Sequence, residues 1–148
     1  MISRRVTVCG VAFVGLIVAL VSGCATTGQP TGQPAFVDAK VVPAKASPGD
    51  KTLVQVKLVD PQGIVSVVVA TVREFSQVSL ELKDNGENGD AVAGDGIWSC
   101  GMEVPAIAPA GEYNWDFEAY DAAINPVQVT GEGGETVPLT AEAASEVL

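Results

Sequence analysis

The sequence predicts an all-β protein: a single antiparallel sandwich of about seven short strands. Apolar and polar residues alternate in several stretches, most clearly over residues 113–120. The apolar face of that stretch consists of Tyr113, Trp115, Phe117 and Ala119. Clusters of Gly, Pro, Asn and Asp separate the alternating stretches, as expected for turns between strands. No long stretch has the 3.6-residue period of an amphipathic helix.

The first two strands are expected over residues 36–42 and 51–59. Pro43 ends the first strand, because proline lacks the N–H that a sheet ladder needs. A Ser-Pro-Gly-Asp turn then leads into the second strand, whose residues alternate in polarity. The apolar face of the second strand is Val54, Val56 and Leu58.

Residues 64–72 form the next expected strand, introduced by an Asp-Pro-Gln-Gly turn. Its near-continuous apolarity predicts burial on both faces, or an outer face covered by a partner. Val65, Val67 and Val69 are therefore a candidate interaction surface, together with Tyr120, whose ring we expect to be exposed.

Later strands are expected over 78–82 and 97–104, on either side of a long polar loop, and then over 113–120 as described. Short strands near 127–130 and 136–139 close the domain. Residues 141–148 are expected to form a loose end, with a helical turn as the alternative, because chain ends are commonly poorly ordered.

Charge and composition argue against several functions. All 18 acidic residues follow position 24, and two of the eight basic residues, Arg4 and Arg5, precede it. Six basic residues therefore remain after position 24, and the net charge there is −12. Nucleic acids and anionic lipid headgroups need clustered Lys and Arg. The absence of histidine excludes Ser-His and Cys-His catalysis and His-ligated zinc or copper, but leaves carboxylate chemistry open.

Residues 1–23 have the organisation of an export signal, with a basic start and an uncharged apolar stretch over 6–21. The stretch ends in Leu-Val-Ser-Gly-Cys24, which resembles the lipobox of bacterial lipoproteins. The resemblance implies cleavage after Gly23 and attachment of diacylglycerol to Cys24, with palmitate among the expected acyl groups. An ordinary signal with a cysteine near its end is the alternative.

A flexible tether is expected over residues 24–35, where Thr-Gly-Gln-Pro is nearly repeated. Ala25 is not an inner-membrane retention signal in lipoproteins of Gram-negative bacteria, so in such an organism the outer membrane is the expected location. Loss of Cys9 with the signal and lipidation of Cys24 leave Cys100 without a disulfide partner. We expect Cys100 to be a small buried apolar residue, with a reactive thiol as the alternative.

Several motifs of the body resemble those of bacterial immunoglobulin-like modules in exported proteins. They are ASPGD at 46–50, DPQGI at 60–64, DNGENGD at 84–90, AGDGIW at 93–98, PAGEY at 109–113 and DAA at 121–123. The resemblance covers residues 36–139 and implies an immunoglobulin-like sandwich, with residues 140–148 as a C-terminal tail. Such modules serve as spacers, adhesion units, polymer-binding attachments or interaction domains, so the fold alone does not give the function.

The polar loop is a candidate calcium site, because Asp84, Asn88, Asp90 and Asp95 offer the hard oxygen ligands that calcium prefers. Their spacing partly mimics a helix-flanked calcium loop, but Gly86 occupies a position that normally supplies a side-chain oxygen. The preferred interpretation is that these residues build turns by accepting hydrogen bonds from nearby backbone N–H groups.

The sequence therefore favours a non-catalytic structural or protein-interaction module of the cell envelope, anchored through Cys24 and requiring no cofactor. The alternative is a calcium-steadied module that binds a ligand or carbohydrate. Trp98 and Trp115 lie on apolar faces and are expected in the core, which leaves Tyr120 as the ring for stacking on a sugar. A small carboxylate-dependent hydrolase is the third hypothesis.

Overall fold

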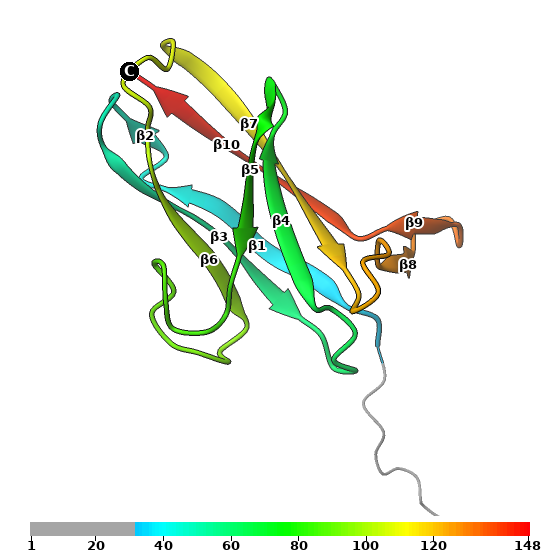
Figure 1. Cartoon of the computed structure of the whole chain (residues 1–148). Coiled ribbons are helices and arrows are strands. Elements are labelled where there is room, and N and C mark those ends of the chain that lie inside the picture. Colours follow the sequence, from blue (N-terminus) through cyan, green and yellow to red (C-terminus); the bar gives the residue numbers. More distant parts are fainter. Residues whose placement is uncertain (1–31) are drawn as a thin grey trace, which may run out of the picture. The chain divides into compact units, whose positions relative to one another are not determined.

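A computed structural model of the chain describes residues 32–148, which form ten strands and no helix (Figure 1). This result confirms the prediction of an all-β fold. Residues 1–23, which we expect to form a signal helix, lie outside the described residues, as do Cys24 and most of the expected tether. Within residues 32–148, no helix is long and apolar enough to cross a membrane.

The strands form two larger sheets and one small hairpin. The three-stranded antiparallel sheet has the order β1 (Ala35–Val42), β3 (Lys51–Val59), β6 (Ile97–Glu103). The five-stranded sheet has the order β2 (Lys45–Ala46), β10 (Thr140–Val147), β7 (Gly111–Tyr120), β4 (Val67–Val72), β5 (Phe75–Leu82). Only the β2–β10 pairing in it is parallel. Strands β8 (Gln128–Thr130) and β9 (Thr136–Pro138) pair separately.

The core lies between the two larger sheets and is built by the alternating residues that the sequence indicates. Val54 and Val56 of β3 are fully buried against Phe117 of β7, and Trp115 is almost fully buried in the same cluster. Trp98 packs against this cluster while remaining half-buried. All residues of the three apolar clusters fall between positions 36 and 147. The compact unit Gly32–Leu148 therefore contains a complete core of its own.

The C-terminal segment is an interior strand, so the prediction of a loose tail over residues 140–148 is wrong. β10 lies between β2 and β7 and pairs with β7 from Thr140 to Val147. Its inward residues include Ala141 and Ala143, which pack against the core. Ala, Glu and Ser are poor strand formers in isolation, but pairing and burial outweigh this weak preference.

Burial on both faces, one of the two expectations for residues 64–72, is also wrong. Strand β4 begins only at Val67 and lies between β7 and β5. Its inner residues Val68, Ala70 and Val72 are buried, whereas the outer face is half-buried. Strand β4 therefore packs against the core with one face only, and its other face is partly exposed to solvent.

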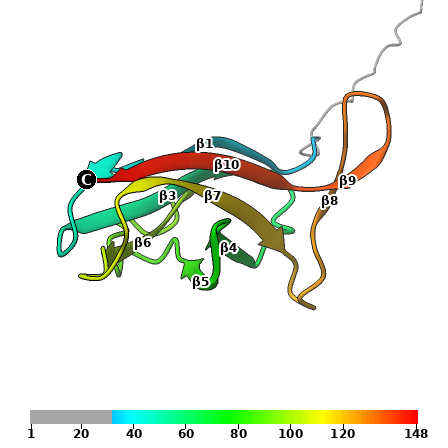
Figure 2. The same cartoon turned by 90° about the horizontal axis from the view of Figure 1, so that it is seen from above.

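The strand directions define two opposite ends of the domain. The loop over residues 83–96, at the lower left of Figure 1, and the β8–β9 hairpin, at its right, both lie away from the C-terminus. Gly32 belongs to the same half of the domain, because its carbonyl accepts a 2.9 Å hydrogen bond from Gln62 in the β3–β4 turn. The C-terminus and the loop over residues 104–110 lie at the other end, and Figure 2 shows the C-terminus opposite the hairpin. We call these the polar-loop end and the pocket end.

Candidate functional site

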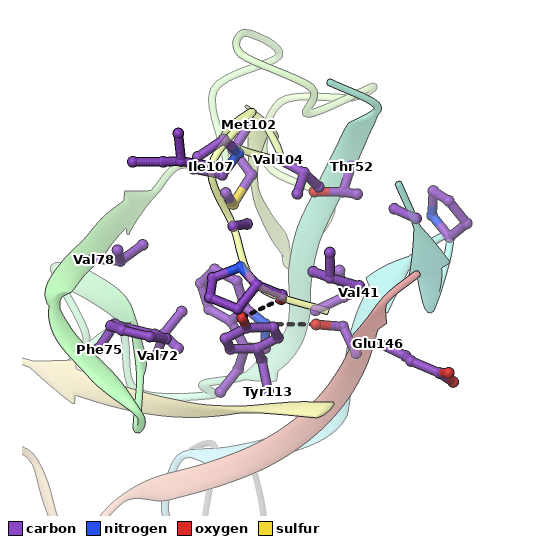
Figure 3. A pocket seen from close by; sticks show the side chains of 18 of the residues that line it. Val41, Thr52, Val72, Phe75, Val78, Met102, Val104, Ile107, Tyr113 and Glu146 are labelled. Atoms are coloured by element: carbon purple, nitrogen blue, oxygen red, sulfur yellow. Dashed lines mark hydrogen bonds between the residues drawn. The ribbon is translucent and has the colours of Figure 1, made fainter. Parts of the chain in front are cut away.

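An apolar pocket of about 280 Å³ opens between the sheets at the pocket end (Figure 3). Phe75 and Val78 of β5 line one side. Met102 of β6 and Ile107 of the following loop line another, and Tyr113 of β7 also contributes. Because these residues come from several separate segments, the pocket exists only in the folded domain.

The pocket arises because the two sheets have unequal numbers of strands. Near the polar-loop end, Lys83 and Ser99 exchange backbone hydrogen bonds of 3.0 and 2.8 Å, which join β5 to β6. Beyond this bridge, no strand of the three-stranded sheet lies beside β6 to cover the inner side of β5. Val78 and Leu80 of β5 are consequently only half-buried.

Large apolar side chains are exposed at the mouth of the pocket. Ile107 is 91% exposed and Phe75 is 37% exposed. The Phe75 ring lies against Tyr113, with their centroids 5.8 Å apart. An apolar concavity bordered by exposed apolar side chains is typical of a binding surface. Sequence reasoning missed it, although an isoleucine between Pro105 and Pro109 in a surface turn was a usable signal.

Several polar side chains in the pocket wall have partners within the protein. The Tyr113 hydroxyl donates to the Pro109 carbonyl at 2.5 Å, and Trp115 Nε1 donates to Ser145 Oγ at 3.1 Å. Glu146 accepts a 2.6 Å contact from Lys45 Nζ, and this hydrogen bond raises the pKa of the Lys45 ammonium. The pocket therefore selects its occupant mainly by apolar contact and shape.

The surroundings of the pocket are acidic. Glu74 precedes β5 and accepts hydrogen bonds from the backbone and side-chain amides of Asn114, at 2.9 and 2.8 Å, which lower the pKa of its carboxyl group. Glu103 ends β6, and Glu112 lies near the start of β7. The nearby Arg73 is already paired with two carboxylates of the five-stranded sheet. These three glutamates are each adjacent in sequence to a pocket-lining residue, and Lys51 lies opposite Glu103 in the β3–β6 ladder.

At the polar-loop end, the structure brings together three of the four predicted calcium ligands. Asp84, Asp90 and Asp95 each offer a carboxylate oxygen within 4.8 Å of the other two. Asn88, the fourth predicted ligand, is not part of this cluster. Its backbone carbonyl accepts a 2.6 Å hydrogen bond from the Gly101 N–H of β6. Calcium ligands lie about 2.3–2.6 Å from the ion, so the three oxygens are close enough to share one.

The same carboxylates also hold the loop in shape. Asp84 Oδ1 accepts hydrogen bonds from Gly94 N–H at 2.7 Å and Asp95 N–H at 3.2 Å, and its Oδ2 accepts one from Gly96 N–H at 3.0 Å. The buried Asp90 accepts from Gly86 N–H at 2.5 Å. The loop therefore has the turn chemistry that the sequence predicts, whether or not a cation joins it.

The outer face of the five-stranded sheet contains three of the four residues expected to form an interaction surface. Val67 lies opposite Tyr120, and Val69 lies opposite Glu118 in the β4–β7 ladder. All three predicted residues are half-buried, and the Tyr120 hydroxyl lies 3.3 Å from a Glu118 carboxylate oxygen. Val65 does not belong to this face, because it packs against the core. The carboxylate interrupts the apolar surface.

Cys100 is half-buried on β6 and packs against the core. Burial raises the pKa of its thiol, which keeps the sulfur protonated at neutral pH. Its environment is that of a packing residue rather than an activated thiolate.

No protein-family model matches the sequence, and no curated protein matches it. A similar solved structure is the endo-beta-1,4-mannanase from Thermotoga petrophila, at 15% sequence identity and a TM-score of 0.43. The match covers 78% of this chain and 19% of the mannanase chain. The chain thus spans about a fifth of that protein's length, and a match this weak carries no argument about activity.

Proposed function

We propose that the chain is a lipid-anchored module of the bacterial cell envelope, whose immunoglobulin-like domain binds another protein and catalyses no reaction. The observation that carries the interaction role is the apolar pocket with its exposed rim at the pocket end. An exposed apolar concavity has no use for folding and is expected to be covered by a partner.

The strand order supports the immunoglobulin-like part of the proposal. Immunoglobulin sandwiches pack a sheet of strands A, B, E and D against one of strands C, F and G. The orders β1-β3-β6 and β10-β7-β4 correspond to A-B-E and G-F-C, with the D strand missing. The chain also passes from one sheet to the other between β1 and β2, near Pro43.

The anchor and the pocket are compatible in position. Cys24 precedes Gly32 by eight positions, and Gly32 is hydrogen-bonded to Gln62 in the β3–β4 turn, at the polar-loop end. A lipid on Cys24 would hold the domain by that end and leave the pocket end free for a partner. In a Gram-negative organism, the proposed location is the outer membrane.

The anchor is tested by growing the native organism with an alkyne-bearing palmitate analogue, for the unaltered chain and for Cys24→Ala. We expect label on the unaltered chain in the membrane fraction and none on the variant. Label that persists on Cys24→Ala, or an unaltered chain that takes up none, contradicts the proposed anchor.

The interaction role is tested by placing a photoreactive phenylalanine analogue at Ile107 in the same cells. The matched control carries it at Val92, which is 57% exposed at the polar-loop end. We expect a discrete adduct with another protein from position 107 and none from position 92. An absent adduct at 107, or the same adducts from both positions, contradicts this role.

A calcium-steadied binding module is a second candidate, favoured by the three carboxylate oxygens within 4.8 Å. Calorimetry with calcium chloride on residues 32–148, with parallel melting curves, tests it. Micromolar binding and a raised Tm, both abolished in Asp95→Asn, support this candidate. Neither heat nor a Tm shift at millimolar calcium leaves the loop with turn chemistry alone.

A further inference from the structure

We infer that the pocket end binds an extended segment of a partner protein, which adds as a strand beside β5. Alternate apolar side chains of that segment enter the pocket, and its basic residues face the acidic rim. This inference rests on the proposed interaction role and names the chemistry of the partner.

The first argument is the free edge of β5. This strand pairs only with β4, so one row of its N–H and C=O groups points away from the sheet. From Phe75 to Leu80, the strand contains no charged residue. Edge strands are usually protected by charges, proline or a covering segment, and an unprotected edge is a template for another strand. Lys83 and Glu81 protect only the far end of this strand.

The second argument is the vacant position opposite β5. The edge of β6 is covered by the Lys83–Ser99 bridge and, two residues further along, by the Asn88 carbonyl bound to Gly101 N–H, so that only Met102 and Glu103 of β6 lie beyond these contacts. Closer to the pocket end, the described residues provide no strand between β5 and β6. A strand added to the edge of β5 would lie in the plane of the five-stranded sheet, and its inward side chains would point into the same space as those of Val78 and Leu80.

The third argument is volume. Side chains of an added strand alternate between the two faces, so every second one points inward. The pocket of about 280 Å³ exceeds the roughly 150 Å³ cavity that holds a benzene molecule. It therefore has room for aliphatic side chains from the added segment.

The fourth argument is charge, which selects a basic partner. Glu74, Glu103 and Glu112 are each adjacent in sequence to a pocket-lining residue. Lys45 and Arg73 are paired within the domain, and Lys51 lies opposite Glu103 in the β3–β6 ladder. The described residues hold all 18 acidic residues and six basic ones, for a net charge of −12. A second copy of this chain would carry the same negative charge to the rim, which opposes edge-to-edge dimerisation.

The test uses a fluorescein-labelled peptide of sequence Lys-Lys-Val-Thr-Val-Thr-Val-Lys-Lys and residues 32–148, which contain a complete core. Fluorescence anisotropy should give a micromolar Kd. We expect at least tenfold weaker binding when the four lysines are replaced by glutamate. The same loss is expected when every second backbone nitrogen is methylated, in the register that faces β5.

Protein variants locate the binding. Ile107→Ser and Phe75→Ser should each weaken peptide binding at least fivefold, whereas Val92→Ser at the polar-loop end should leave it unchanged. Melting curves establish that each variant is folded, and because the three residues are all exposed we expect similar Tm values.

The control peptide is methylated on the alternate backbone nitrogens, which face away from β5. Equal affinity for the two methylated peptides would overturn strand addition, because the hydrogen bonds to the edge of β5 would then make no contribution. No binding at millimolar peptide, or dimerisation of the domain by sedimentation equilibrium, would also overturn it. If the Ile107 photoadduct nevertheless forms in cells, the proposed interaction role stands and only the strand-addition inference fails.

Discussion

The two ends of this domain differ in how far their backbone groups are hydrogen-bonded and their apolar side chains are covered. At the polar-loop end, Asp84 and Asp90 accept the N–H groups of their own loop, and Asn88 binds the neighbouring strand β6. At the pocket end, one edge of strand β5 is unpaired and the Ile107 side chain is exposed to solvent. At the first end the carboxylates bind N–H groups of their own loop, whereas at the second end no segment of residues 32–148 covers the pocket.

This difference indicates where to look for function in an acidic β domain. The polar loop is easily recognised in the sequence because its carboxylates are close together, but several of their oxygens accept hydrogen bonds from backbone N–H groups of the loop. The pocket is assembled from distant segments and has little polar signal. Loss of stability should therefore follow mutation at the polar-loop end, and loss of binding should follow mutation at the pocket end.

The largest effect on stability is expected from Gly89→Ala at the polar-loop end. Gly89 has φ +100°, and a Cβ there would lie 2.5 Å from Leu53 Cδ1 and 3.2 Å from the Gly101 nitrogen. The strain and crowding should lower the free energy of unfolding by about 3 kcal/mol, measured by urea denaturation. Gly94→Ala is the matched control, because its φ is +77° but nothing lies within 4 Å, and it should cost about 1 kcal/mol. Equal losses would show that the close packing of Gly89 is unimportant.

Removal of the Asp84 carboxylate should have the next largest effect. Asp84→Ala removes the side-chain acceptor of three backbone N–H groups, those of Gly94, Asp95 and Gly96, which should lower the free energy of unfolding by about 2 kcal/mol. Asp95→Ala removes one hydrogen bond, to Ile97 N–H, and should cost about 1 kcal/mol or less. Chemical denaturation of both variants checks this order, and a larger loss for Asp95→Ala contradicts it.

Much of the fold was predictable because its strands carry the two-residue period in strong form. The valines of β3 and the aromatic residues of β7 alternate, and both inward faces are buried as expected. β10 was missed because its inward Ala141 and Ala143 are small and its outward residues include glutamate. Its pairing with β7 is a long-range property that no local pattern reveals.

The candidate sites differ in the same way. Asp84, Asp90 and Asp95 are near one another in sequence, so one loop brings them together and local reasoning finds them. The pocket residues Phe75 and Ile107 belong to different segments, and they meet only because one sheet has fewer strands than the other. Strand number and order decide such a pocket, and neither is encoded in a local motif.

Acid should destabilise both ends modestly. Hydrogen bonds from Asn114 lower the pKa of Glu74 near the pocket, and those from Asn125 and Ala123 lower the pKa of Asp121 near the polar-loop end. A lowered folded-state pKa gives stability that is present above the ordinary carboxyl pKa of about 4 and is lost as pH falls through the folded value. The free energy of unfolding should therefore fall from pH 5 to pH 3.

Denaturation at several pH values measures this slope. The slope should be smaller in Glu74→Gln and in Asp121→Asn than in the unaltered domain, because each variant removes one titrating group. An unchanged slope in both variants would assign the acid sensitivity to other carboxylates.

The smallest effect on stability is expected at the pocket rim. Ile107 is 91% exposed, so Ile107→Ser should change the free energy of unfolding by less than about 0.5 kcal/mol. Urea denaturation beside Asp84→Ala gives the contrast between the two ends directly. A loss of more than about 1 kcal/mol in Ile107→Ser would mean that the side chain belongs to the core rather than to a surface for a partner.

The most direct test of the central claim is amide chemical-shift mapping of ¹⁵N-labelled residues 32–148 during titration with indole, a small bicyclic apolar probe. The account predicts saturable shifts at Val78, Met102, Ile107 and Tyr113, with little change over residues 84–96. Shifts concentrated instead on Val67, Val69 and Tyr120, or in the polar loop, would contradict the assignment of binding to the pocket end.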